Sequence, residues 1–304
     1  MIRAILVPIG SLDRAEIAVQ HAAAIAAALA AQVTILAMTG HLSGASTERF
    51  TDPVAWQLMK SETKAALGEL VQYLQSRQIQ TELDELDTPA AEALVHYQTD
   101  HDFGLVILAV DENDPLPLMR ALLNHSQVPI LLARAQAPVQ YANILVPLDG
   151  SQRAECVLPL ATTLAQAGNG KLLLTHVIHR PEMPRRTSLS AEDGDLAQRL
   201  IERNQSEAEL YLNDLVSRLP VDAEPRLVID DSVTTALHQA VEREAVDLVM
   251  FCAHGFSGKP QWPLGGIASN LISYCPVSVV VVQDLPMSIP QAQVDPSRRT
   301  NGAS

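Results

Sequence analysis

The chain has 304 residues, which exceeds the ~100–200 residues of a typical domain and therefore favours two domains. Apolar residues make up 47% of the sequence and charged residues 18%, the balance of a globular protein with a sizeable core. The formal net charge of −14 repels phosphate backbones and anionic lipids, so it argues against nucleic acid and membrane surfaces as partners.

The first half alternates short apolar runs with helical segments. A strand beginning at Ile5 breaks at Gly10 and Ser11 and leads into an Ala-rich helix. The further predicted elements are a strand at Gln32–Ala37, a helix at Pro53–Gln78, a strand at Gln80–Leu86, a helix from near Pro89, and strands at Gly104–Ala109 and Val128–Ala133.

The same order returns in the second half. Ile5-Leu6-Val7-Pro8 matches Ile144-Leu145-Val146-Pro147, and this internal repeat indicates two copies of one unit. The predicted elements are strands at Ile144–Gly150 and Lys171–Val177, a helix at Asp195–Leu219, a strand at Pro225–Ile229, a helix from near Ser232, and strands at Asp247–Cys252 and Pro276–Val282. Leu210 and Tyr211 of the long helix are core candidates.

Strands that alternate with helices imply right-handed crossovers and a parallel sheet. We therefore predict an α/β fold of two repeated, doubly wound, five-stranded parallel-sheet domains. The first spans residues 1–138 and the second residues 139–284. Residues 285–304 carry Pro286, Pro290 and Pro296 with little apolar mass, and are predicted to be a disordered tail. Ligands of such sheets bind beyond the carboxyl ends of the strands, at the topological switch point.

A glycine-bearing segment, Cys252–Gly266, connects the fourth strand of the second half to the next helix. Glycines let backbone N–H groups approach phosphates closely, and a helix N-terminus favours an anion. Glycines that serve only the turn geometry would give the same pattern, so both interpretations stay open. The candidate binding residues of this segment are Ala253, His254, Gly255, Gly258, Gly265 and Gly266.

Pro147 and Asp149 stand where the first strand of the second half ends. The first and fourth strands are neighbours at a switch point, so Asp149 can face the same crevice as the glycines. Its carboxylate can accept a hydrogen bond from a ribose hydroxyl or an adenine amine. An aspartate that caps a helix or closes a turn is the alternative.

These motifs resemble the universal stress protein family over about residues 1–284. ATP-binding members of that family carry Gly, two residues, Gly, nine residues, Gly, then Ser or Thr, with an Asp after the first strand. Gly255 and Gly265 match the second and third Gly, whereas Cys252 replaces the first Gly and Gly266 replaces the hydroxyl residue.

The resemblance implies Rossmann-like (HUP-type) domains and a stress-response or signalling role. It implies binding of ATP, with or without Mg²⁺, in the second half, with Val177 at the adenine. The first half is a degenerate copy, because Gly10 replaces the aspartate and its loop carries Asp111, Glu112 and Asp114, which repel a triphosphate. No residue argues for catalysis, although slow ATP hydrolysis is not excluded. No metal site is expected from the histidines.

The family resemblance also predicts that the last strands of the two halves, Val128–Ala133 and Pro276–Val282, pair within the chain. The halves would then form an intrachain pseudo-dimer, with a homodimer of whole chains as a further option. The three cysteines form no paired framework, and the N-terminal apolar run is too short for a secretory signal, so a cytoplasmic location is expected.

Two other functions compete with nucleotide binding. An interaction scaffold of the same fold, with no nucleotide, is favoured by Cys252 and Gly266. An adenylating ligase of a related α/β group needs a Ser-Gly-Gly-rich loop after the first strand, and neither Gly10-Ser11 nor Asp149-Gly150-Ser151 supplies one.

Overall fold

The structure is a computed structural model. It describes residues 2–38, 53–86, 91–109, 116–125, 128–134, 139–180, 191–255 and 264–283. The predicted tail at 285–304, the acidic residues of the first-half loop and Gly258 lie outside these ranges.

Within these ranges, ten strands form one sheet in the order β3-β2-β1-β4-β5-β10-β9-β6-β7-β8. The strands of the first half are β1 (Ala4–Ile9), β2 (Gln32–Met38), β3 (Thr81–Leu86), β4 (Leu105–Ala109) and β5 (Ile130–Ala133). Those of the second half are β6 (Asn143–Pro147), β7 (Lys171–His179), β8 (Ala223–Asp230), β9 (Leu248–Cys252) and β10 (Ser278–Val282). Within each half the strands are parallel and follow the same order. The order in which strands are added to the sheet reverses at the β1–β4 pair in the first half and at the β6–β9 pair in the second, so these pairs are the topological switch points.

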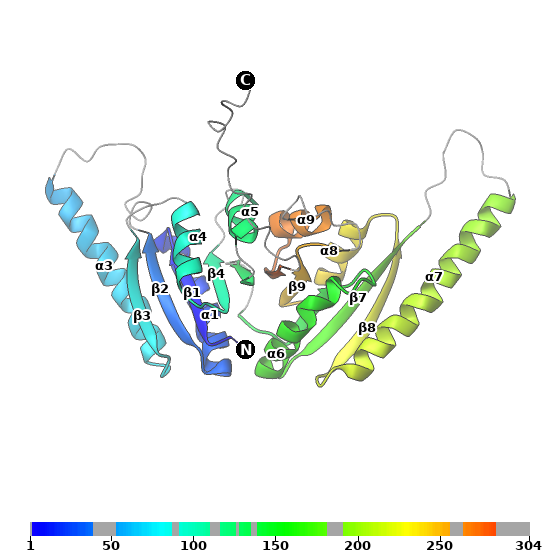
Figure 1. Cartoon of the computed structure of the whole chain (residues 1–304), viewed down its shortest axis with the longest axis horizontal. Coiled ribbons are helices and arrows are strands. Elements are labelled where there is room, and N and C mark those ends of the chain that lie inside the picture. Colours follow the sequence, from blue (N-terminus) through cyan, green and yellow to red (C-terminus); the bar gives the residue numbers. More distant parts are fainter. Residues whose placement is uncertain are drawn as a thin grey trace, which may run out of the picture.

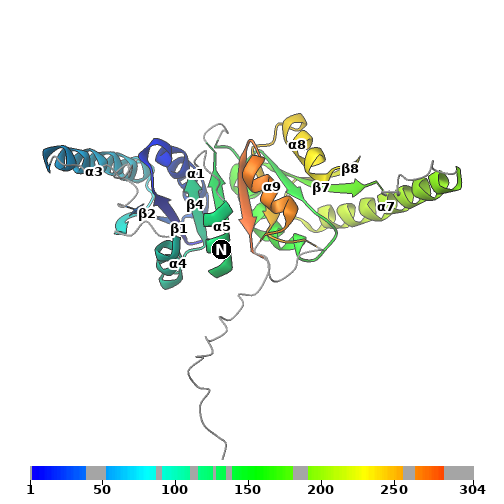
Figure 2. The ribbon, with the colours of Figure 1, turned by 90° about the horizontal axis from the view of Figure 1, so that it is seen from above.

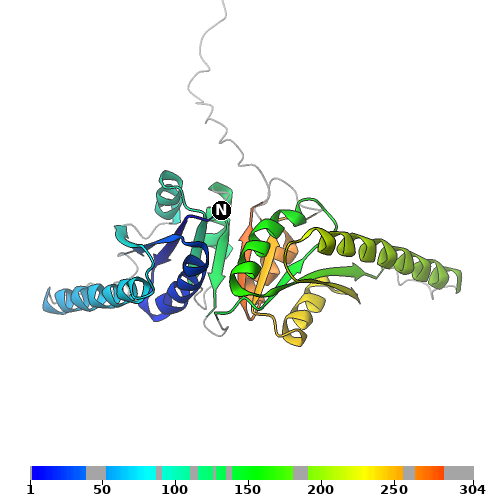
Figure 3. The ribbon, with the colours of Figure 1, turned by 90° about the horizontal axis from the view of Figure 1, so that it is seen from below.

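Helices cover both faces of the sheet (Figures 1–3). One face packs against η1 (Leu12–Arg14), α1 (Ala15–Leu29), α3 (Pro53–Gln75), η2 (Ala154–Val157), α6 (Leu158–Gly168) and α7 (Ala191–Arg218). The other face packs against α4 (Ala91–Asp100), α5 (Leu116–His125), α8 (Val233–Arg243) and α9 (Gly266–Tyr274).

Side chains of β1 alternate between these two cores. Ile5 and Val7 belong to one core and Leu6 to the other, and all three are fully buried. A sheet buried on both faces needs mainly apolar strands, which is why β1, β6 and β9, near the middle of each half, consist almost entirely of apolar residues. The long helices α3 and α7 lie at opposite ends of the molecule (Figure 1).

The two halves meet where β5 pairs with β10 in antiparallel register, with Leu131 opposite Val280. A buried polar chain crosses the same joint. His21 of α1 lies 2.8 Å from the Tyr141 hydroxyl through Nδ1 and 3.0 Å from the Ser278 hydroxyl through Nε2. The backbone N–H of Arg134 also donates to Ser278 Oγ, at 3.1 Å. Burial lowers the pKa of His21 to about 4, so the ring is neutral at pH 7.

The α/β fold with two repeats of a doubly wound sheet is confirmed, with the addition that the ten strands join into one sheet. Most predicted bounds are correct within a few residues; α7 begins at Ala191, four residues earlier than expected. The assignment of Leu210 to the core is wrong, because its side chain is 68% exposed. Tyr211, the next residue along α7, packs against the core as predicted.

Candidate functional site

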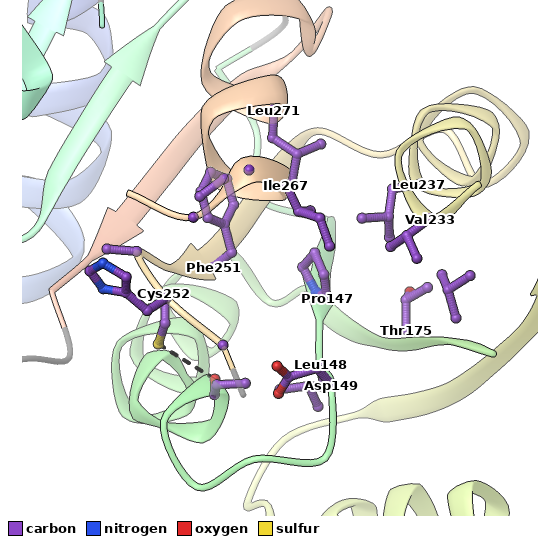
Figure 4. Close-up of a pocket in the computed structure, with 18 of the residues that line it drawn as sticks. Pro147, Leu148, Asp149, Thr175, Val233, Leu237, Phe251, Cys252, Ile267 and Leu271 are labelled. Carbon is purple, nitrogen blue, oxygen red and sulfur yellow. Dashed lines mark hydrogen bonds between the residues drawn. The ribbon is translucent and has the colours of Figure 1, made fainter. Parts of the chain in front are cut away.

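A cavity of about 290 Å³ opens in the second half, beyond the carboxyl ends of β6, β7 and β9 (Figure 4). The pairing of β6 with β9 places the loops that follow these two strands side by side. Helices α8 and α9 complete the wall. The lining residues are Pro147, Leu148, Asp149, Ala154, Thr175, His176, Val177, Val233, Leu237, Phe251, Cys252, Ala253, His254, Gly255, Gly265, Gly266, Ile267, Ala268 and Leu271.

Asp149 and Gly255 are in direct contact across this cavity. A Cβ added at Gly255 would lie 2.1 Å from Asp149 Oδ2, so any side chain at this position would force the carboxylate to move. The other oxygen, Oδ1, accepts hydrogen bonds from the backbone N–H and the hydroxyl of Ser151, at 3.0 and 2.6 Å. Asp149 therefore closes a turn, as the alternative interpretation expected, and also faces the glycine segment. Gly150, which stands between Asp149 and Ser151 in this turn, has φ +83°, a backbone conformation that favours glycine.

The N-terminus of α9 borders the same cavity. Gly265 is the N-cap, and its own N–H donates to the Ala253 carbonyl at 2.9 Å. The Gly265 N–H thus already has a hydrogen-bond acceptor. The N–H groups of the first helical turn, from Gly266 onward, point out of the helix along its axis. A Cβ at Gly266 would meet nothing within 4 Å. The site therefore has space for a side chain at Gly266.

Apolar side chains from α8, α9 and β9 line the opposite part of the cavity. Val233, Leu237 and Leu271 lie away from Asp149 in Figure 4. Ser232 fixes the start of α8, because its hydroxyl accepts from the Thr235 N–H at 3.3 Å. The cavity thus has an apolar side and a polar side, the arrangement expected for a small-molecule site.

His176 of β7 also lines the cavity. Its Nδ1 lies 2.8 Å from the Leu148 carbonyl oxygen, which can only accept, so Nδ1 carries the proton. This hydrogen bond ties β7 to the segment that leads into Asp149. β7 ends at His179, two residues beyond the predicted end at Val177.

Cys156 of η2 and Cys252 at the end of β9 form a disulfide, 96 residues apart in sequence. The expectation that the three cysteines form no paired framework is therefore wrong for Cys156 and Cys252. The spacing of the two residues carries no signal for the pair. Only the adjacency of β6 and β9 brings η2 against Cys252.

Eight of the nine predicted binding residues line this one cavity: Pro147, Asp149, Val177, Ala253, His254, Gly255, Gly265 and Gly266. The ninth, Gly258, lies outside the described residues. Val233, Leu237, Phe251 and Ile267 line the cavity as well, but in the sequence their apolar side chains look like core residues of helices and strands. Thr175 also lines it, and in the sequence it stands inside the apolar run of β7.

Within the described ranges, no three His, Cys, Asp or Glu side chains are grouped as metal ligands. Over the same ranges, no helix is both long and apolar enough to cross a bilayer.

Residues 140–283, which contain the whole cavity, match the sequence model of the universal stress protein family. The sequence likeness to the universal stress protein family therefore covers the second half of the chain. A curated relative named for that family, from Staphylococcus aureus (strain USA300), is 27% identical over 149 residues, which are 48% of this chain and 86% of the relative.

Solved structures extend the likeness in fold to both halves. A universal stress protein from Archaeoglobus fulgidus DSM 4304 aligns with a TM-score of 0.60 at 14% identity, over 92% of this chain and 96% of its own. A functionally unknown protein from Pseudomonas aeruginosa PAO1 aligns with a TM-score of 0.64 at 15% identity, over 93% of each chain. At these identities the likeness establishes the fold alone.

Proposed function

We propose that the second half binds one adenine nucleotide, ATP, in the cavity at the β6–β9 switch point, and that the protein serves a stress-response or signalling role without catalysis. The observation that carries this proposal is the contact between Asp149 and Gly255 at the mouth of a cavity that α9 enters with its N-terminus. At this place a glycine backbone contacts a carboxylate, and the N-terminus of a helix lies beside them.

The two sides of the cavity suggest how the nucleotide lies. The adenine packs between Val177 and the apolar side chains Val233 and Leu237, where burial of its faces excludes water. The ribose hydroxyls donate to Asp149. The phosphates accept from backbone N–H groups at Gly266 and the next residues of α9.

The size of the cavity agrees with this arrangement. Its volume of about 290 Å³ lies just below the range of roughly 300–1,000 Å³ for ligand pockets. The nucleoside part fills such a volume, and the phosphates then extend to the rim. Asp149 is the one carboxylate among the described lining residues, so a Mg²⁺ ion would be held mainly by phosphate oxygens and water.

Two measurements test the proposal. Nucleotide released from the purified protein by acid denaturation is identified by chromatography, and calorimetric titration with ATP and Mg²⁺ gives the stoichiometry. We expect at most one ATP per chain. A stoichiometry near two would contradict the assignment to the second half alone.

The alternative is an interaction scaffold that binds no nucleotide. Two departures from the family motif favour it, Cys252 in place of the first Gly and Gly266 in place of the hydroxyl residue. Absence of any bound or titrated nucleotide would support the scaffold function.

For the domain organisation, we propose a degenerate unit at 1–138 and a nucleotide-binding unit at 139–284, joined as an intrachain pseudo-dimer. The antiparallel β5–β10 pair supports this, because each of these two strands would otherwise be an unpaired edge of its own half-sheet.

A further inference from the structure

The disulfide between Cys156 and Cys252 lies at the wall of the candidate nucleotide site. Cys252 lines the cavity at the end of β9, three residues before Gly255. Cys156 belongs to η2, which follows the turn that holds Asp149. The bond therefore joins the two segments that supply the polar side of the cavity.

Hydrogen bonds extend this link to Asp149. The backbone N–H of Ala154, the first residue of η2, donates to Ser151 Oγ at 3.2 Å, and the Ser151 hydroxyl donates to Asp149 Oδ1 at 2.6 Å. On the other side of the link, Asp149 Oδ2 packs against Gly255. Asp149, Ser151, η2, the disulfide and the residues up to Gly255 thus form a closed ring around one edge of the cavity.

The two cysteine residues differ in exposure. Cys156 is half-buried, whereas Cys252 is 8% exposed. Cys252 Sγ lies 3.5 Å from the Ala154 carbonyl oxygen (dashed line in Figure 4), so a free thiol at this position has a hydrogen-bond acceptor on η2. The third cysteine, Cys275, is 1% exposed, and burial raises the pKa of its thiol. Cys156 is therefore the member of the pair that a small reagent can reach. Cys252 contacts η2 in both redox states, through the disulfide when oxidised and through the Ala154 carbonyl when reduced. Cys275, by contrast, is buried away from solvent.

We propose that Cys156 and Cys252 are a reversible thiol–disulfide pair that controls the affinity of the nucleotide site; this inference rests on the proposed function. The oxidant is a small-molecule disulfide such as glutathione disulfide. The Cys156 thiolate attacks one of its sulfurs and releases one thiol. The Cys252 thiolate then attacks the Cys156 sulfur and releases the second thiol. The two cysteines lose two electrons and two protons, and the oxidant is reduced to two thiols.

Oxidation strengthens nucleotide binding. The disulfide holds η2 against β9 and thereby keeps Asp149 in place against Gly255 before the ligand arrives. In the reduced protein, η2 is free to move relative to β9, so binding must order the ring as well as the ligand. In the oxidised protein the site is preorganised, so binding does not include the entropy cost of ordering η2 and Asp149. We therefore expect oxidation to lower the Kd for ATP by about tenfold.

The test compares oxidised and reduced full-length protein. Glutathione disulfide treatment followed by desalting gives one sample, and tris(2-carboxyethyl)phosphine gives the other. Alkylation of free thiols and mass spectrometry verify the state of each cysteine, and calorimetry with ATP and Mg²⁺ gives the Kd. Cys156→Ser removes the pair without touching the cavity lining, and Cys275→Ser is the matched control.

We expect wild type and Cys275→Ser to bind about tenfold more tightly when oxidised. Cys156→Ser should bind like reduced wild type in both samples. Equal affinity of the two wild-type samples, with the disulfide verified in one, would overturn redox control and leave nucleotide binding intact. Failure of the disulfide to form or to be reduced would also overturn it. No ATP binding in either sample would instead refute the proposed function, and the inference with it. The wild-type comparison needs no variant, so poor folding of Cys156→Ser would not prevent a decision.

Discussion

A single methyl group at Gly255 should disable the site without disturbing the fold. In Gly255→Ala, the new Cβ would lie 2.1 Å from Asp149 Oδ2 and 3.0 Å from Asp149 Cγ. Carbon and oxygen reach ordinary contact near 3.5 Å, so the carboxylate must retreat by roughly 1.4 Å. The Ser151 hydrogen bonds to Oδ1 cannot keep their geometry during that movement.

The expected cost falls on ligand binding. Displacement of Asp149 removes a charged hydrogen bond to the ribose, which is worth about 1.5–3 kcal/mol. Affinity for ATP should therefore fall by roughly 10- to 150-fold. The Asp149 side chain can rotate away from the methyl group, so the thermal unfolding midpoint should change little.

Calorimetry on four proteins measures this effect: wild type, Gly255→Ala, Asp149→Ala and the double variant. Because both changes remove the same hydrogen bond, Gly255→Ala should cost almost nothing in the Asp149→Ala background. Gly266→Ala is the matched control, since a Cβ there meets nothing within 4 Å. Wild-type affinity in Gly255→Ala, or additive costs in the double variant, would refute the proposed role of the contact.

Three further predictions concern the helix start, the joint and the halves. Gly266→Ser should tighten ATP binding, by about 0.5–1.5 kcal/mol for one added hydrogen bond, because the open space at Gly266 admits a hydroxyl. Gly265→Val should abolish binding, because its side chain occupies cavity space; unchanged calorimetric titrations of these two variants would contradict the phosphate position. Folding lowers the pKa of His21 from 6.5 to about 4. Between these pH values the imidazole is protonated in the unfolded chain but neutral in the folded chain, so the free energy of unfolding should fall by about 3 kcal/mol from pH 6.5 to pH 4. Urea unfolding of wild type and His21→Gln over this pH range measures the effect. If the free energy of unfolding of both proteins depends on pH to the same extent, His21 is not the cause. Separately expressed residues 1–138 and 139–304 should self-associate or co-purify, because each exposes the edge strand that pairs at the joint; two monomers in size-exclusion chromatography would argue against the pseudo-dimer.

Much of the fold follows from local patterns. The repeated Ile-Leu-Val-Pro runs, followed by Ala-rich helical segments, predict two copies of a strand–helix unit. The alternation of such units leaves few topologies, because crossover connections are right-handed and short. The same rule predicts that Asp149 and the glycine segment lie at neighbouring strand ends, and the β6–β9 pair places them there.

The rest required the tertiary structure, because it depends on contacts between residues far apart in the chain. No spacing rule connects Cys156 to Cys252, since a disulfide depends on Cα atoms within about 7 Å, a distance set by the packing of η2 on β9. His21, Tyr141 and Ser278 look unremarkable in sequence, yet they meet at the joint as a buried hydrogen-bonded chain. Leu210 fits a helical apolar pattern and is exposed, because the core contacts only one face of α7. The sequence by itself determined the elements, their order and the strand ends that carry the site. Tertiary packing decided which side chains touch, because those contacts join segments whose separation along the chain carries no periodic signal.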